Sequence, residues 1–498
     1  MGDIVLLGKS ALGLVGAILT IALPTRAFLF RLTNRQFSWL AFAALLASRL
    51  ALFVLLYLVL NLQVQSDTKD YYDWTKDWLA GKVLYDEIPS CYMPFFHYII
   101  AGAVLVWDSG KSAVLLAILM DLAALLVWTR VSRALFDERI TRIATVLYVV
   151  NPIAIWSVAA AGQNQVWLML MLGISLLFLA RGRDMLSGAA LGASIIVVKF
   201  LSMLYAPAVA LCSRRPVLWS IAFVAVPFIV YAGYRMGGVD LKDTGRIVAS
   251  ETSSGNLPYM VSLVGVDVRG DGFKRGATLV GAGMLALLCA TAAWKLRHGP
   301  REPRRAIFLV TLFQVAFMLV SKKSHAFYLE MCFFAVLLTL ACYADGPSLR
   351  KALWFFAIFL VAGSVEQSLW FRDNWMRMND FHVLWDAQLR QEYSLGVLAL
   401  FFLLQLILLG FYLWTFMLSW RLAFAKSTDR VATLTQQAFN PAPDCRWCEN
   451  GLYLGVQLSS ETSHDPRAHG TCKAVKPTPP EVPALQVSPA QPQRRRRR

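Results

Sequence analysis

Residues 39–60 read WLAFAALLASRLALFVLLYLVL, and Arg49 is the one charged side chain in this run. A bilayer core about 30 Å thick is crossed by roughly 20 helical residues, so the run is long enough to span a membrane. Backbone polar groups find no water in lipid, and a helix bonds them internally. The stretch therefore predicts a transmembrane helix.

Runs of this kind recur from the N-terminus to about Trp420. Of the 498 residues, 57% are hydrophobic and 16% are charged, too apolar a composition for a water-soluble globule. The predicted fold class is all-α, a polytopic transmembrane helical bundle of about 12–13 helices. The expected helices lie at residues 4–23, 39–60, 113–130, 143–160, 164–180, 185–199, 201–212, 217–235, 276–296, 305–321, 326–343, 352–369 and 395–420.

We expect two parts, a transmembrane domain over residues 1–424 and a cytoplasmic, mostly disordered tail over residues 425–498. The tail is rich in Ser, Thr, Pro and Gln, with too little periodic apolar sequence for a core. It ends in the basic run from Arg494 to Arg498. Such a run is usually solvated, but it could also attract anionic lipid headgroups.

The net charge of +17 comes from Lys and Arg residues gathered between the helices and at the C-terminus. They form no groove interleaved with aromatic residues, so nucleic acid is not an expected partner. The eight cysteines are scattered and imply no disulfide framework. The spacing of a Cys2His2 zinc site is met in the tail by Cys445, Cys448, His464 and His469, although its composition favours disorder.

Lys and Arg divide the segments between helices into two sets, and short cytoplasmic loops usually hold the basic set. The basic segments are 26–35, 130–142, 181–183, 214–215, 295–305 and 350–351. The other segments are 61–112, 162–164, 236–275, 321–325 and 370–394, and they hold most of the unusual polar residues. We therefore expect these polar residues on the non-cytoplasmic face, with the short apolar stretch 93–107 as an interfacial or re-entrant helix.

Asp67 and Asp70 lie in an acidic and aromatic segment, SDTKDYYDWTKDW at residues 66–78. Transfer of a glycosyl group to a hydroxyl requires a general base, and a carboxylate at the membrane surface can act as one. The same two carboxylates are candidate ligands for a divalent cation such as Mg or Mn, which would neutralise a leaving phosphate. The alternative is that they only solvate an outer loop.

This loop resembles the first outer loop of the GT-C glycosyltransferases, most closely the polyprenyl- or dolichyl-phosphate-mannose-dependent mannosyltransferases. The pattern consists of Asp67-x-x-x-Tyr71, Trp78-Leu79-x-Gly81-x-x-Leu84-Tyr85 and Tyr92-x-Pro94-Phe95-x-x-Tyr98. The resemblance implies a base or metal ligand at Asp67, with Asp70 as second choice, and a substrate contact at Tyr71. The family's usual Tyr-Pro-Pro is here Tyr92-Met93-Pro94.

A second set of motifs is similar to the same family in content and order. It consists of Asn151-Pro152, Gly162-Gln163-Asn164, Leu179 to Arg183, Gly188 to Gly192, and Lys199. The resemblance implies substrate contacts at Gln163 and Asn164, although both residues also suit an ordinary turn. The family often has Asp where this chain has Gln165. Whatever the function, Gly188 and Gly192 predict close helix packing.

Lys199 lies in an apolar stretch, where an uncompensated ammonium is costly. It is expected either to reach a donor phosphate or to extend toward the interface. A third motif, Lys322-Lys323-Ser324-His325-Ala326-Phe327-Tyr328, looks like the family's Lys-x-x-His-Glu-x-Tyr element, with Ala326 in place of Glu. By this resemblance Lys322, His325 and Tyr328 are candidate contacts of a leaving phosphate.

The hypothesis from sequence is an inverting membrane glycosyltransferase that moves a hexose, by resemblance mannose, from a lipid-phosphate sugar to a lipid-linked or glycan acceptor. Its other partners would be membrane lipids, and no cofactor beyond the candidate cation is implied. The active site is expected on the lumenal or periplasmic side of an endoplasmic reticulum or bacterial inner membrane. The alternatives are a transporter or lipid flippase, and a non-catalytic subunit of a transferase complex.

Overall fold

The computed structural model describes residues 2–65, 67–88, 90–239, 253–261, 266, 270–343, 347–372 and 395–425. Regular structure in these ranges is helical, apart from one isolated bridge between Leu84 and Ile88, which confirms the all-α prediction. Residues 426–498 of the predicted tail lie outside the described part, together with the tail's proposed zinc ligands and most of the loop 370–394.

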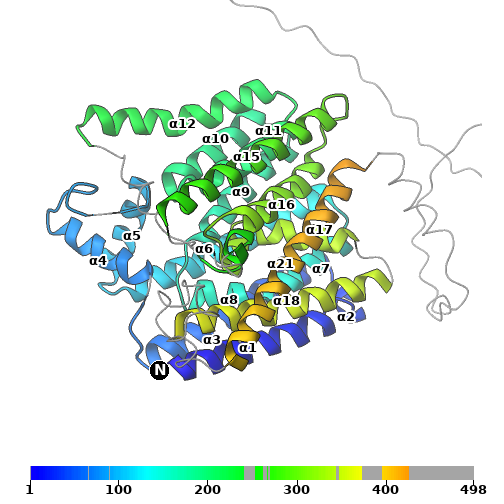
Figure 1. Ribbon diagram of the computed structural model, residues 1–498, viewed down its shortest axis with the longest axis horizontal. Helices are drawn as coiled ribbons and strands as arrows, with labels where there is room; N and C mark the ends of the chain where they lie inside the picture. The colour runs from blue at the N-terminus through cyan, green and yellow to red at the C-terminus, as the bar shows by residue number, and fades with distance from the viewer. Residues whose placement is uncertain are drawn as a thin grey trace, which may run out of the picture. The chain divides into compact units, whose positions relative to one another are not determined.

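The helices follow the predicted apolar runs closely (Figure 1). In the first half of the chain they are α1 (Gly2–Ala22), α2 (Ala27–Arg31), α3 (Asn34–Phe53), the π-helix η1 (Val54–Val59), α4 (Asp67–Leu79), α5 (Pro94–Val106), α6 (Lys111–Leu135), α7 (Glu138–Val149), α8 (Pro152–Ala159), α9 (Gln165–Ala180) and α10 (Asp184–Val197). The second half contains η2 (Phe200–Tyr205), α11 (Ala206–Cys212), α12 (Pro216–Met236), α14 (Leu257–Met260), α15 (Asp271–Leu296), α16 (Pro303–Val320), η4 (Ala326–Cys332), α17 (Phe333–Tyr343), α18 (Pro347–Arg372) and α21 (Leu395–Phe424).

Eight helices in the described ranges are long and apolar enough to cross a membrane, and α7 with α8 would make a ninth, bent span. The chain is therefore a multi-pass membrane protein. Three of the predicted runs form shorter apolar helices, Gln165–Ala180, Asp184–Val197 and Phe200–Cys212. The expected non-spanning stretch is likewise a short helix, Pro94–Val106. Each of these helices is shorter than the roughly 20 residues of a full span.

The predicted helix at 143–160 is broken at Asn151-Pro152, where α7 and α8 meet at 54°. Proline has no N–H for the helix ladder, so the break is expected there. The Asn151 carboxamide oxygen accepts hydrogen bonds from the N–H groups of Ile153 and Ala154, at 3.0 and 3.4 Å, and caps α8. After the bend, α8 leads directly into the loop that precedes α9.

Two glycines allow α10 and α12 to touch backbone to backbone. A Cβ atom at Gly188 would lie 2.2 Å from the carbonyl oxygen of Trp219, and one at Gly192 would lie 2.3 Å from that of Phe223. Both distances are well below van der Waals contact, so only glycine fits without a backbone shift. The predicted packing role of this motif is confirmed.

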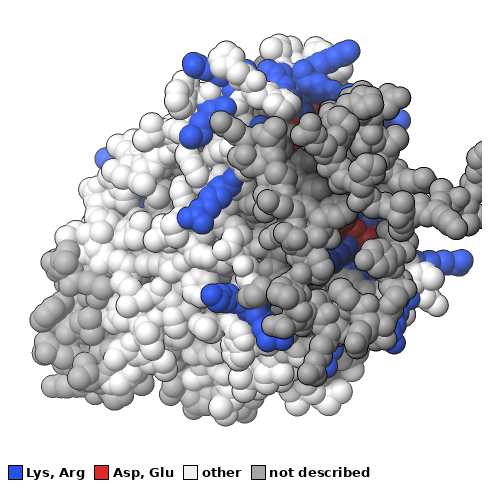
Figure 2. Space-filling model, turned by 90° about the vertical axis from the view of Figure 1, so that its right-hand side faces the viewer, with Lys and Arg blue, Asp and Glu red and all other residues white. Residues whose placement is uncertain are grey.

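The basic segments gather at the end of the bundle opposite α4 and α5. Arg133 donates to the Ser38 hydroxyl at 3.0 Å, and Arg301 donates to the Arg214 carbonyl at 3.3 Å. The Arg304 guanidinium lies 4.8 Å from the ring centre of Phe136. In Figure 1, α4 and α5 lie at the left and α2 at the right, and the described surface of the right-hand end shows many more Lys and Arg than Asp and Glu (Figure 2).

Candidate functional site

The carboxylate of Asp67 sits at the start of α4, where a negative charge suits the helix dipole. It accepts a hydrogen bond from the Tyr92 hydroxyl at 3.2 Å, and Tyr92 in turn accepts one from the Tyr71 hydroxyl at 3.1 Å. Both tyrosines are buried. Burial raises the pKa of Tyr71 and of Tyr92, and the charge of Asp67 raises them further, so both stay protonated donors. The pair holds Asp67 in place.

Asp70 lies one helical turn further along α4 and is exposed. Burial of its carboxyl group raises the pKa, and the neighbouring charge of Asp67 adds to the shift. Within the described ranges no three His, Cys, Asp or Glu residues come close enough to hold a metal ion together. Asp67 and Asp70 offer two carboxylates for a cation, and no third His, Cys, Asp or Glu among the described residues joins them.

Lys199 lies beside Tyr92. Its ammonium is 5.4 Å from the centre of the Tyr92 ring, and the adjoining backbone is tied by a 3.3 Å hydrogen bond from the Met93 N–H to the Val198 carbonyl. Burial lowers the pKa of Lys199, the charge of Asp67 opposes that shift, and the charge of Lys323 adds to it. The Asp67 carboxylate and the Lys323 ammonium group therefore act in opposite directions on the pKa of Lys199.

The pKa of the Cys91 thiol responds to the same charged groups. Burial raises the pKa of its thiol, while the charges of Lys199 and Lys323 lower it and the charge of Asp67 raises it. The charge of Lys323 thus acts on Cys91 and Lys199, the same two groups on which the charge of Asp67 acts. Lys322, the lysine chosen from sequence, feels Lys274 and Asp271 of α15 instead, and burial with the Lys274 charge lowers its pKa.

The Gln163 turn packs against the first turn of α4. The Thr68 hydroxyl donates to the Ala161 carbonyl, and the Tyr57 hydroxyl of the π-helix donates to the Ala160 carbonyl. Gly162 has a φ of +55°, and a Cβ there would lie 2.8 Å from the Thr68 hydroxyl oxygen. Glycine is therefore required both for the backbone conformation and for the close approach.

His325 lies in the middle of the third motif and occupies the N-cap position of η4, with no side-chain capping bond. Its ring is buried and stacks on Phe327 at 5.2 Å between ring centres. Burial lowers the pKa of His325 well below its usual value, and the positive charges of Lys323 and Lys9 lower it further. The imidazole is neutral near pH 7, so it can donate a hydrogen bond but adds no charge.

The 321–325 turn is clamped by a serine from the loop before α14. The Ser253 hydroxyl donates to the Ser324 carbonyl at 2.9 Å and accepts from the Ser324 N–H at 2.6 Å. The Ser253 N–H donates to the Lys322 carbonyl at 2.9 Å. These bonds fix the backbone that presents Lys323 and His325.

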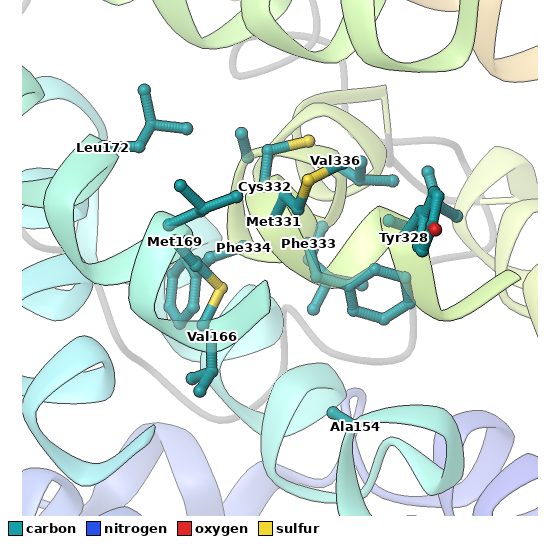
Figure 3. Close-up of a cluster of buried hydrophobic side chains, with 14 of the residues drawn as sticks. Ala154, Val166, Met169, Leu172, Tyr328, Met331, Cys332, Phe333, Phe334 and Val336 are labelled. Atoms are coloured by element: carbon teal, nitrogen blue, oxygen red, sulfur yellow. The ribbon is translucent and has the colours of Figure 1, made fainter. Parts of the chain in front are cut away.

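Helix η4 is joined to the other two motifs through buried polar bonds. Ser157 of α8 donates its hydroxyl to the Glu330 carboxylate, and its carbonyl accepts from the Gln163 N–H at 2.9 Å. Gln314 of α16 donates to the Tyr328 carbonyl at 3.1 Å and accepts from the Tyr205 hydroxyl at 2.6 Å. Apolar side chains of α9 and of η4 with α17 fill the space between (Figure 3).

The sequence reading missed Glu330, Ser157 and Gln314. An ionisable side chain inside an apolar run is a signal that it faces the bundle interior, and Glu330 showed that signal. The partner of such a residue depends on how helices far apart in sequence meet, so Ser157 and Gln314 had no comparable signal. Tyr328, chosen from sequence, is buried, and its backbone carbonyl is the group held by Gln314.

Part of the chain matches a known protein family. Residues 91–322 match Glycosyltransferase family 87, a region that includes Tyr92, the Gln163 turn and Lys199 but ends before Lys323 and begins after Asp67. No curated protein matches the chain. The match does not specify donor, sugar or acceptor, but it indicates glycosyltransferase activity. The matched region, 232 of the 498 residues of this multi-pass membrane protein, is similar to Glycosyltransferase family 87.

Proposed function

We propose that the protein transfers a hexose, by resemblance mannose, from a polyprenyl- or dolichyl-phosphate sugar to a lipid-linked or glycan acceptor, with inversion. The observation that supports this proposal is the cluster of one carboxylate, Asp67, with two ammonium groups, Lys199 and Lys323, at the end of the bundle opposite the basic loops. By charge asymmetry that end is non-cytoplasmic, in the endoplasmic reticulum or a bacterial inner membrane.

In this mechanism Asp67 accepts the proton of the acceptor hydroxyl as its oxygen attacks the anomeric carbon. The bond from that carbon to the phosphate oxygen breaks, and the phosphate leaves with the electron pair. A single displacement inverts the anomeric centre. Lys199 and Lys323 offset the charge that grows on the phosphate, and neutral His325 is available as a hydrogen-bond donor.

Tyr92 and Tyr71 orient the base in this proposal. Their hydroxyls form a chain that ends on one oxygen of Asp67. Any divalent cation at Asp67 and Asp70 would draw its remaining ligands from water or from the donor phosphate, as such cations usually do. Such a cation would neutralise negative charge on the phosphate.

The test is transfer from radiolabelled polyprenyl-phosphate mannose to candidate acceptors by the purified protein in lipid nanodiscs. We expect a labelled product from the wild-type protein and none from Asp67→Asn. Asp73→Asn is the matched control, because Asp73 lies on the same helix, is exposed and pairs with Lys69. Equal activity of the Asp67 and Asp73 variants would remove Asp67 as the base, and wild-type protein without activity would favour a non-catalytic subunit.

A transporter or flippase remains the second candidate because polar residues continue into the spanning helices. Arg49 of α3 pairs with Asp121 of α6 at 3.0 Å, and both side chains are fully buried. Tyr148 also donates to Asp121. Movement of labelled lipid-phosphate sugar across proteoliposomes, unaffected by Asp67→Asn, would support transport over transfer.

A further inference from the structure

Three consecutive amide side chains in the Gln163 turn are buried with polar atoms that bond to nothing. Gln163 is 5% exposed, and Asn164 and Gln165 are each 1% exposed. The Gln163 Oε1, the Gln165 Oε1 and both polar atoms of Asn164 have no hydrogen-bond partner in the described structure. A buried amide without partners is costly, and native proteins rarely keep one without a reason.

Buried amides elsewhere in the chain show what the usual solution is. Gln314 is fully buried, and its amide both donates and accepts. Asn256 is also fully buried; its oxygen caps α14 at Tyr259 and its nitrogen donates to Ser253 at 2.7 Å. Asn164 stands at the equivalent capping position of α9, yet its side chain makes no capping bond. Asn164 differs from the other buried amides because both of its polar atoms are unpaired in the described structure, whereas Asn151 and Gln405 each leave one atom unpaired.

The position of the turn indicates what would bond to these amides. Thr68 is bonded to Ala161 and follows Asp67 directly, so the turn adjoins the candidate base. The cations of the site lie around Tyr92, which is also bonded to Asp67. An amide is neutral and offers a donor and an acceptor side by side, which suits vicinal hydroxyl groups better than a phosphate.

We propose that Gln163, Asn164 and Gln165 form the subsite for the hydroxyl groups of the transferred sugar, with Asn164 as its central contact. This inference rests on the proposed transferase function and divides the donor between two groups of residues. The lysines bind the lipid phosphate, and the amides bind the neutral sugar. A carboxamide at residue 165 also allows sugar recognition there without a charge.

The experiment compares two ligands, polyprenyl-phosphate mannose and sugar-free polyprenyl phosphate, in binding and thermal unfolding assays on the purified full-length protein. Wild-type protein is expected to bind the mannose lipid more tightly. Asn164→Leu is expected to bind both lipids equally, with about tenfold or greater loss for the mannose lipid alone. Without ligand its melting temperature should equal or exceed that of wild type, because an unsatisfied buried group has been removed.

Gln165→Met, which keeps the shape of an α9 side chain, provides a second variant should Asn164→Leu fail to fold. Gln314→Leu is the matched control: it should melt at a lower temperature but keep the preference for the mannose lipid. The inference is overturned if both turn variants retain that preference, or if both melt as low as Gln314→Leu. Wild-type protein that ignores both lipids would instead overturn the proposed function.

Discussion

Two buried polar regions of this bundle differ in how completely they are bonded. Deep among the spanning helices, Asp121 is shared by Arg49 and Tyr148, and Arg49 also donates to the Val149 carbonyl at 3.2 Å, near the break between α7 and α8. In that region one guanidinium nitrogen, Nη2 of Arg49, lacks a partner, whereas in the Gln163 turn neither polar atom of the Asn164 amide has one among the described residues. The difference indicates that the first region stabilises the fold, whereas the second is arranged for a ligand.

The largest expected effect is at Asp67, where replacement should reduce transfer activity without reducing stability. Replacement by Asn keeps the size of the side chain and its acceptance of the Tyr92 hydrogen bond, but removes the base. We expect transfer to fall about 10²- to 10⁴-fold, the usual contribution of a general base. Initial rates with labelled donor would measure the loss, and the melting temperature should stay near that of wild type. An Asp67→Asn variant that unfolds early would place Asp67 with the structural region.

The converse experiment is Asp121→Ala, which leaves the Arg49 guanidinium buried without its carboxylate. Breaking a buried ion pair from one side costs about 3–5 kcal/mol. The measurement is unfolding in detergent, with Asp137→Ala as a control for a carboxylate that only caps α7. If Asp121→Ala unfolds no earlier than that control, Asp121 does not belong to the stabilising region.

The two adjacent lysines provide an internal test of the site. The charge of Lys323 acts on Cys91, Lys199 and His325, whereas the charges of Lys274 and Asp271 act on Lys322. Lys323→Ala is expected to slow transfer about 10²-fold, as loss of one charge-stabilising donor does. Lys322→Ala should stay within a few-fold of wild type. If Lys322→Ala slows transfer more than Lys323→Ala does, the choice of Lys322 from the sequence motif is supported.

These lysines also show what the sequence could and could not predict. Apolar runs located the helices, because the length and composition of a span are local properties. Glycine spacing likewise predicted close helix packing at Gly188 and Gly192, but not that α12 is the partner. Which of two neighbouring lysines acts on Lys199 and Cys91 depends on the backbone of the 321–325 turn, which Ser253 sets from a distant loop. The break at Asn151-Pro152 was available from sequence but was read as one continuous helix.

A smaller effect is expected at the glycine contact that supports the matched domain. Gly188→Ala would place a Cβ against the Trp219 carbonyl, and overpacking of this kind costs about 1–3 kcal/mol. Gly283→Ala in α15 is the matched control, because a Cβ there meets nothing within 4 Å. The difference between the two melting temperatures measures the contact. Equal melting temperatures would show that α10 and α12 can separate without loss.

The smallest expected effect concerns the buried neutral imidazole of His325. Burial, with the charges of Lys323 and Lys9, lowers its pKa in the folded protein, so below pH 6.5 the unfolded chain binds a proton that the folded chain does not. Stability should therefore decrease as the pH falls below 6.5, by at most about 1.4 kcal/mol for each pH unit. His97, whose pKa burial also lowers, contributes in the same direction. His325→Gln should flatten part of the slope between pH 6.5 and 5, and His97→Gln should flatten another part. If only His97→Gln has an effect, His325 is protonated in the folded state and belongs with the cations of the site.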